Sequence, residues 1–309
     1  MFIKQLVVLM QKLKFLPFYL LSFIPLQLLF VISDIAFVFV YYVFRYRRRV
    51  VAANLVNSFP DKSQKEIKKI ERNFYRHLCD LTVETVKALT ISKKEISNRF
   101  HIINKELVEQ LYREEKNVVL YTAHFGNWEW IIFLPLFLSH RITVLYQPLS
   151  SAYFDQLMKL IRSRFGIHCI ESSKGYKTLL KNQKENIISL NCIVGDQSPV
   201  RNATVHWVRF LNQVTAFSIG ADMIAKKSDQ TMVFSCFQKL KRGKYEVRFQ
   251  HMNGSATGNK KHDIIDEYAQ LLEENIIRTP EFWLWSHKRW KLNSLQGHNN
   301  RVHKPNNQQ

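Results

Sequence analysis

The residues with the clearest potential for chemistry are His124 and Glu129, which lie five positions apart in a chain of 309 residues. The apolar run 118–120 before them predicts a buried strand, and the apolar run 130–138 after them predicts a buried helix. Within one helix, five steps would place the two side chains about 140° apart. They can therefore meet only if His124 lies in the turn and Glu129 lies in the first turns of the helix.

This arrangement suits a general base. A carboxylate that holds one ring nitrogen leaves the other nitrogen facing a substrate, a role that contributes about 10²–10⁴ in rate. The free N–H groups at the start of the helix would suit an oxyanion or a phosphate. The spacing is equally compatible with a structural role, in which His124 caps the helix and Glu129 is a solvated acid of its first turn.

The full string His-Phe-Gly-Asn-Trp-Glu at 124–129 resembles the H-x4-D/E block of the glycerophospholipid and lipid A acyltransferases. It is most similar to the lauroyl and myristoyl transferases of lipid A biosynthesis, a branch of the lysophospholipid acyltransferase superfamily. The segment 45–60 and the string Trp-Ser-His-Lys-Arg-Trp at 285–290 resemble further blocks of that family. The resemblance thus covers nearly the whole chain.

The resemblance implies that His124 deprotonates an acceptor hydroxyl, which attacks an acyl thioester, while Glu129 orients the ring. It implies a membrane-bound O-acyltransferase that moves a fatty acyl group from acyl carrier protein or acyl-CoA to a lipid A precursor, an anionic lipid. The implied location is the bacterial inner membrane, with the catalytic domain on the cytoplasmic side and no cofactor or metal. Two alternatives stay open: another acceptor (a phosphatidylinositol mannoside or a lysophospholipid), or a non-catalytic, membrane-anchored lipid-binding protein.

Further residues are assigned to substrate binding on the strength of the resemblance. Arg162 and Arg164 end a predicted helix over 151–165, and a guanidinium suits phosphate or carboxylate. The family has an arginine-bearing helix at this place, which favours Arg164 over Arg162. Alternatively, both arginines only complement the helix dipole. Asn127, within the histidine block itself, is assigned to substrate as well.

The pair Asp196 and Gln197 follows a predicted strand over 187–194. Alone, the surrounding Gly, Asp and Pro are as typical of a plain turn as of a site. The family has a similar Asp-Gln pair at the corresponding place. The resemblance therefore assigns Asp196 and Gln197 to the wall of the site or to acceptor contact.

The first 44 residues differ from the rest and form a predicted membrane anchor, because Asp34 is the only charge over 15–44. Pro17 and Pro25 would kink this segment. A single span, a kinked segment lying in one leaflet and a buried pair of core helices are all compatible with it, whereas the length of the run disfavours a signal peptide. The arginines over 45–49 favour a cytoplasmic location for the domain after the anchor.

Residues 45–292 are predicted to form one α/β catalytic domain, a mixed and mainly parallel sheet flanked by helices, followed by a polar, disordered tail over 293–309. A site at the carboxyl ends of the strands would include His124. The segment 205–220 is similar to a family loop that leads into a helix, and 281–290 is predicted to be a docking helix. The expected strands are 100–103, 118–123, 142–147, 168–171, 187–194, 232–238 and 245–251, and the expected helices are 105–113, 128–138, 151–165, 175–184, 218–227 and 263–278.

The formal net charge of +20 suits acidic partners such as a carrier protein or lipid phosphates. It would also suit nucleic acid, but no recognised nucleic-acid motif is present and the apolar N-terminus argues against that class. The four cysteines are widely separated and form no metal-binding pattern, which indicates reduced structural thiols.

Overall fold

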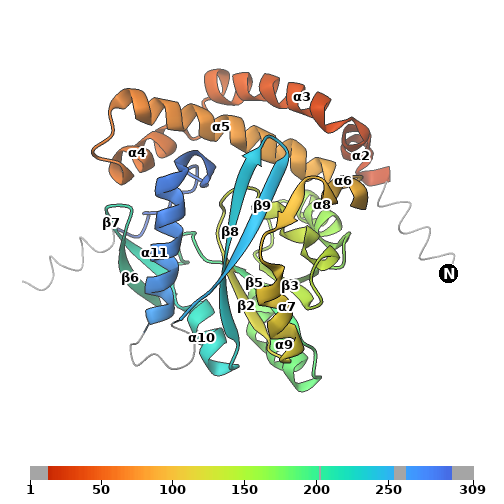
Figure 1. The fold of residues 1–309 in the computed structure, drawn as a ribbon. Helices are drawn as coiled ribbons and strands as arrows, with labels where there is room; N and C mark the ends of the chain where they lie inside the picture. The colour runs from red at the N-terminus through yellow and green to blue at the C-terminus, as the bar shows by residue number, and fades with distance from the viewer. Residues whose placement is uncertain (1–12, 202, 254–261, 294–309) are drawn as a thin grey trace, which may run out of the picture.

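The computed structural model describes residues 13–201, 203–253 and 262–293. Its centre is a seven-stranded sheet in the order β1-β9-β8-β2-β5-β3-β4 (Figure 1). Neighbouring strands are parallel except in the β8–β9 hairpin, so the predicted mixed, mainly parallel sheet is confirmed. The strands are β1 (Phe100–Ile102), β2 (Val118–Thr122), β3 (Arg141–Tyr146), β4 (His168–Glu171), β5 (Ser189–Val194), β8 (Thr231–Lys241) and β9 (Lys244–His251).

Helices cover both faces of this sheet, as the alternation of strands and helices in the sequence predicts. Two expected helices have the predicted bounds, namely α7 (Lys105–Arg113) and α11 (Asp263–Arg278). The others are α4 (Arg48–Ser58), α5 (Gln64–Lys87), α6 (Lys93–Ser97), α8 (Ala152–Ser163), α9 (Ser172–Lys184) and α10 (Gly220–Lys227).

Strand β2 shows why the sheet must be covered on both sides. All five of its residues are buried. Successive side chains of a strand point to opposite faces, and here Val118 and Leu120 belong to one apolar cluster while Val119 and Tyr121 belong to the other. The unbroken apolar run that follows Asn117 in the sequence is thus the signature of a central strand.

Helix α5 lies across the edge of the sheet at which β2 and β8 end (Figure 1). It begins with a capping box in which Ser63 and Glu66 satisfy each other's free backbone N–H groups. Its apolar positions, among them Ile67, Ile70 and Phe74, are buried against the domain. This placement brings the polar residues in the second half of α5 next to the turn that carries His124.

The described part of the predicted anchor consists of α2 (Leu16–Phe23), α3 (Leu26–Val38) and a π-helical continuation, η1 (Phe39–Val43). Pro25 separates the first two helices. The stretch Leu26–Val43 is long and apolar enough to cross a membrane, with a mean hydropathy of 2.1, and 28% of it is buried. Figure 1 shows α3 lying along the outside of α5. Residues 1–12 and 294–309 fall outside the described residues.

A second, two-stranded sheet departs from the sequence-based expectation. Instead of a loop leading into a helix, residues 205–218 form a hairpin of β6 (Val205–Phe210) and β7 (Gln213–Ser218). The two residues at its tip, Leu211 and Asn212, have φ of 49° and 61°. Positive φ at both central positions is the geometry of a two-residue hairpin turn, for which Asn is suited and Leu is not. Because Leu211 stands where Gly, Asn or Asp is usual, the sequence did not indicate this turn.

The structure also differs from the sequence-based prediction at two expected helices, 128–138 and 281–290. The segment after His124 is a 3-10 helix, η2 (Trp128–Leu136), and Pro135 inside it lacks the N–H that an α-helix would need. The predicted docking helix over 281–290 is wrong, because only η3 (Pro280–Phe282) is helical there. Trp283 forms an isolated β-bridge with Phe125, so this segment binds the turn that carries His124 as extended chain.

Candidate active site

His124 and Asp196 are brought together by the register of two neighbouring strands. Strands β2 and β5 are parallel, and Thr122 pairs with Val194 at their carboxyl ends. His124 and Asp196 each follow two residues later, so they leave the same edge of the sheet side by side. The ring Nδ1 of His124 lies 2.8 Å from Oδ1 of Asp196.

The contact with Asp196 fixes which ring nitrogen is available for chemistry. A carboxylate oxygen accepts, so Nδ1 of His124 carries the ring proton and donates a hydrogen bond to Asp196. Nε2 is left as the acceptor, and the side-chain amide of Gln197 donates to it over 3.2 Å. The histidine side chain is 20% exposed, and that of Gln197 lies at the surface beside it. A substrate hydroxyl could therefore replace the Gln197 amide at Nε2.

Asp196 is a buried carboxylate, and its surroundings keep it ionised. Its second oxygen, Oδ2, accepts a hydrogen bond of 2.8 Å from the indole Nε1 of Trp283. Burial alone would raise the pKa of Asp196, but the neighbouring His124 ring and the hydrogen bonds from His124 and Trp283 bring that pKa below its ordinary value. An ionised partner holds the ring in one tautomer and stabilises the imidazolium that forms during proton transfer.

The expected pairing of His124 with Glu129 needs correction. The carboxylate of Glu129 accepts two hydrogen bonds from Arg162 of α8, at 3.1 Å from Nε and 2.7 Å from Nη2. This is a bidentate pair, and both side chains are largely buried. The acid that holds the histidine is Asp196, because the strand register presents it directly, whereas the turn of η2 directs Glu129 toward α8.

Two other residues that the sequence assigns to substrate binding, Arg164 and Asn127, make structural contacts instead. The sequence favours Arg164 over Arg162, but Nη1 of Arg164 donates to the backbone oxygen of Ala88 over 2.7 Å, so Arg162 is the arginine tied to the histidine block. Asn127 is fully buried, and its amide donates to Oε2 of Glu84 over 2.6 Å. Asn127 thus fixes the turn to α5 and does not face a substrate.

The turn after β2 is held rigidly from both sides. Gly126 has φ of 61°, and a Cβ atom there would lie 2.5 Å from the backbone oxygen of Phe237. Its N–H donates to the oxygen of Phe282, while its own oxygen accepts from Nε2 of His77 over 3.0 Å. Only glycine fits a position with this φ and this closeness to a neighbouring strand.

Helix α5 contributes two residues that sequence reasoning did not connect to the site, His77 and Glu84. They are seven positions apart and therefore lie on one face of the helix. Burial lowers the pKa of His77 to about 3, with Lys239 adding to the effect, so the ring is neutral. Burial raises the pKa of Glu84 to about 7, with Asp80 adding to the effect and Lys239 opposing it. Their spacing of seven residues was the one sequence signal that they share a helix face. Ordinary core residues have the same spacing, so the signal does not indicate a site.

The C-terminal segment supplies a second group of neighbours. The ring Nε2 of His287 accepts the backbone N–H of Ser198 over 3.0 Å, and burial lowers the pKa of His287 to about 4. Arg289 is 2% exposed and stacks on the ring of Phe217 at 4.4 Å. Burial lowers the pKa of Arg289 to about 10, and the charge of Asp196 opposes that shift. Both side chains interact electrostatically with Asp196.

Comparison with known proteins assigns the chain to a family. A curated relative from Haemophilus influenzae, named "Lipid A biosynthesis acyltransferase", is 22% identical over 273 residues, which cover 86% of this chain and 82% of the relative. The model of the bacterial lipid A biosynthesis acyltransferase family matches residues 7–292, nearly the entire chain. The protein therefore belongs to the bacterial lipid A biosynthesis acyltransferase family, an acyltransferase family, as the block at 124–129 indicates.

Proposed function

We propose that the protein is a membrane-bound O-acyltransferase that transfers a fatty acyl group from an acyl thioester to a hydroxyl of a lipid A precursor. The family and the relative support the reaction class and the acceptor. The single observation that supports the mechanism is the placement of the His124 ring, whose Nδ1 lies 2.8 Å from Oδ1 of Asp196 and whose Nε2 faces the side-chain amide of Gln197.

In the proposed reaction, His124 Nε2 accepts the proton of the acceptor hydroxyl while the oxygen attacks the thioester carbonyl. Asp196 stabilises the imidazolium that results. When the tetrahedral intermediate collapses, the new C–O ester bond remains, the C–S bond breaks, and the imidazolium returns the proton to the leaving thiolate. The cycle ends with neutral His124 and no covalent intermediate on the enzyme.

Glu129 and Arg162 are proposed to act as a unit beside this base. The bidentate contact holds the guanidinium of Arg162 in one orientation, and 21% of its side chain stays exposed. Such a cation suits a phosphate of the acceptor lipid or of the donor. In this proposal Glu129 positions Arg162, and the acid of the H-x4-E block acts on the histidine only indirectly.

The proposed membrane contact is made by α3 and η1 lying along one leaflet. The buried side chains Leu29 and Phe37 face the domain, while the opposite side exposes large apolar side chains over 28–44, including Val31 and Ile35. An apolar row on an otherwise docked helix suits a bilayer surface. The proposed location is the inner membrane with the domain on its cytoplasmic side, where acyl carrier protein or acyl-CoA, both acidic, could reach a chain of net charge +20.

The test is acyl transfer by the purified full-length enzyme, with acyl carrier protein and CoA thioesters as donors and a lipid A precursor, a lysophospholipid or a phosphatidylinositol mannoside as acceptors. Mass spectrometry of the product lipid should show ester formation on the lipid A precursor. His124→Ala should reduce the rate by about 10²–10⁴, and His251→Ala, at an exposed histidine of β9, should not. Undiminished transfer by folded His124→Ala would refute the mechanism, and preference for another lipid would refute the acceptor.

A further inference from the structure

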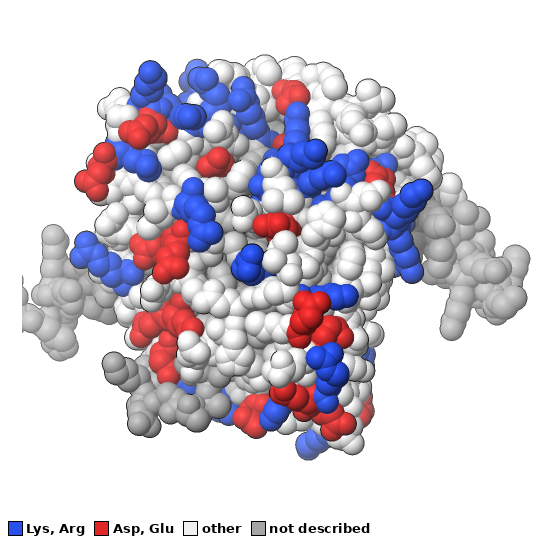
Figure 2. Space-filling model, in the orientation of Figure 1, with Lys and Arg blue, Asp and Glu red and all other residues white. Residues whose placement is uncertain are grey.

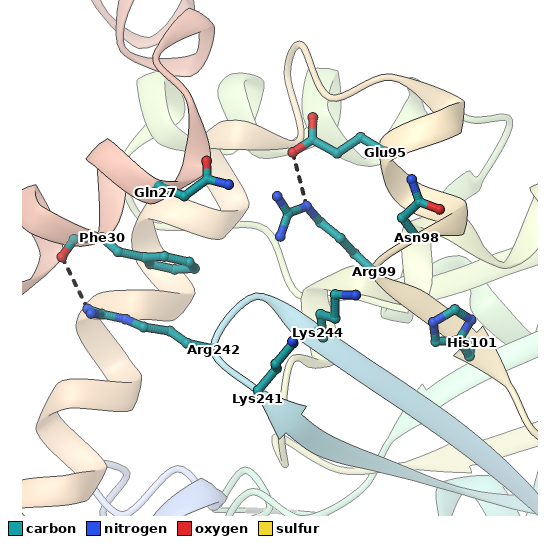
Figure 3. A pocket seen from close by; sticks show the side chains of 9 residues that line it. All are labelled: Gln27, Phe30, Glu95, Asn98, Arg99, His101, Lys241, Arg242 and Lys244. Atoms are coloured by element: carbon teal, nitrogen blue, oxygen red, sulfur yellow. Dashed lines mark hydrogen bonds and ion pairs between the residues drawn. The ribbon is translucent and has the colours of Figure 1, made fainter.

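A basic cavity lies between α3, the loop from α6 to β1 and the tip of the β8–β9 hairpin. It has a volume of about 720 Å³, and none of its lining residues belongs to the cluster around His124. Figure 3 shows that its side chains come from these three separate parts of the chain and surround one space. The apolar helix α3 contributes two residues to the wall of this cavity, Gln27 and Phe30.

The charge of this cavity is strongly unbalanced. Four lining residues are permanent cations and a single one, Glu95, is an acid. Arg99 pairs with Glu95, and Arg242 pairs with Asp34 and Asp80. The ammonium groups of Lys241 and Lys244 have no hydrogen-bond or ion-pair partner among the residues that the structure describes. Two free cations in one concave site favour an anion with several acceptor oxygens.

The hairpin tip is held in place before any ligand arrives. Nη2 of Arg242 donates both to Asp34 of α3, at 2.8 Å, and to Asp80 of α5, at 2.6 Å. The guanidinium of Arg99 donates to the backbone oxygen of Gly243. Gly243 has φ of 72°, and a Cβ there would lie 2.9 Å from the ring of Phe30. The cavity is therefore preorganised, which reduces the entropy cost of binding.

Apolar surface borders the cavity directly. Beyond Gln27 and Phe30, α3 exposes the neighbouring side chains Leu28 and Val31, which are 57% and 54% exposed. Figure 2 shows that Lys and Arg gather in the upper part of this face, below a largely uncharged rim where α3 lies. A ligand that matches both features has an anionic head and a hydrocarbon tail.

We propose that this cavity binds the phosphate headgroup of an anionic membrane glycerophospholipid, separately from the acceptor lipid in the active site. Lys241 and Lys244 contact the phosphate, and the acyl chains lie along the exposed side of α3. The bound lipid fixes the orientation of the domain at the bilayer. The inference rests on the membrane contact in the proposed function, but it does not depend on the chemistry at His124.

The test measures binding and not catalysis. Full-length protein in a neutral detergent is titrated with dihexanoyl phosphatidylglycerol, and its affinity is measured by isothermal calorimetry. Dihexanoyl phosphatidylcholine and inorganic phosphate are the comparison ligands. Phosphatidylglycerol should bind most tightly. Since each lysine near an anionic lipid surface contributes about a factor of 5 in affinity, Lys241→Gln with Lys244→Gln should weaken binding by about 10- to 30-fold.

The matched control is Lys177→Gln with Lys184→Gln, which removes the same charge from exposed positions of α9 and should leave the affinity unchanged. The charge-preserving Lys241→Arg with Lys244→Arg should retain binding, and it keeps the test valid if the glutamine variant is unstable. Equal affinities for the lysine-to-glutamine pair at the cavity and the control pair would overturn the inference. Equal binding of phosphatidylcholine or of inorganic phosphate would overturn its assignment to an anionic lipid.

His124→Ala separates this inference from the proposed function. That variant should bind phosphatidylglycerol with unchanged affinity while it loses acyl transfer. Loss of transfer with retained binding in this variant supports both ideas, whereas retained transfer with retained binding would refute only the proposed mechanism. Failure of each proposal therefore has its own readout.

Discussion

At the scale of single residues, the site depends on which acid meets His124. The 2.8 Å contact from Nδ1 to Asp196 leaves Nε2 as the ring nitrogen that can accept a proton, and Trp283 donates to the second oxygen of the same carboxylate. Asp196 is 2% exposed, so its charge acts on the ring with little screening by water.

Asp196→Asn tests this role at almost constant volume. The amide can donate to Nδ1 and favour the wrong tautomer, and it cannot stabilise an imidazolium, so we expect kcat to fall by about 10²–10⁴ with little change in KM. Steady-state kinetics with a saturating acyl thioester would measure the effect. A KM effect alone would contradict the assignment and would indicate that Asp196 binds substrate.

A second residue-scale prediction separates Glu129 from the base. If Glu129 acts through Arg162, then Glu129→Gln and Arg162→Gln should raise KM for the acceptor by similar factors, of the order of 10-fold. The double variant should be no worse than either single one, because the two side chains form one bidentate unit. A fall in kcat on Glu129→Gln as large as that on Asp196→Asn would instead place Glu129 on the histidine.

At the scale of elements, α5 is the helix that fixes the turn with His124. Its polar face carries His77, which donates to the oxygen of Gly126, and Glu84, which accepts from Asn127. These bonds satisfy backbone and side-chain groups that the turn would otherwise leave buried and unpaired. Helix α5 also carries α3 on its outer side, so one element connects the apolar surface to the turn that holds His124.

The neutral His77 predicts a pH dependence of stability. Its pKa is about 3 in the fold and near 6.5 in the unfolded chain, so the unfolded chain binds one more proton between these values. Its contribution to stability is complete above about pH 6.5 and is lost as the pH falls toward 3, by about 2 kcal/mol at pH 5.

His77→Gln, which cannot titrate, should be less stable at pH 7 and should lose less stability between about pH 7 and pH 5 than the natural chain. Free energies of unfolding from urea titrations at the two pH values give the comparison. The difference between the two proteins removes the contributions of other groups, including His287, whose pKa is also lowered. Parallel pH profiles would show that His77 is protonated or exposed in the fold.

At the scale of the whole molecule, buried Asp80 joins three parts that are far apart in the sequence. It accepts from Ser33 of α3 at 2.8 Å, from Lys239 of β8 at 3.1 Å and from Arg242 at the hairpin tip at 2.6 Å. Removing this carboxylate leaves the largely buried ammonium group of Lys239 without its counterion. The attachment of α3 to α5 and to the β8–β9 hairpin therefore depends on a buried acid as well as on apolar packing.

Asp80→Ala should destabilise the protein by about 3–5 kcal/mol and loosen α3 from the domain. The matched control is Asp34→Ala, because Asp34 contacts the same Arg242 but its side chain is 59% exposed, and it should cost about 1 kcal/mol or less. Thermal unfolding gives the stabilities, and limited proteolysis between α3 and α4 reports detachment of the helix. Equal effects of both substitutions would show that the cluster acts as a surface ion pair.

The sequence by itself determined the class of fold, all seven strands of the main sheet and the histidine at the end of β2, because apolar periodicity and strand boundaries are local properties. It also indicated the family through one compact block. The tertiary structure decided which side chains are in contact. The register of β2 and β5 places His124 beside Asp196, and the packing of α8 places Arg162 beside Glu129. Contacts between residues 72 positions apart depend on strand order and helix docking, which no local spacing encodes. For the same reason, only the tertiary structure shows three further features. These are the β6–β7 hairpin, the hydrogen bond from Trp283 to Asp196 and the basic cavity beside α3.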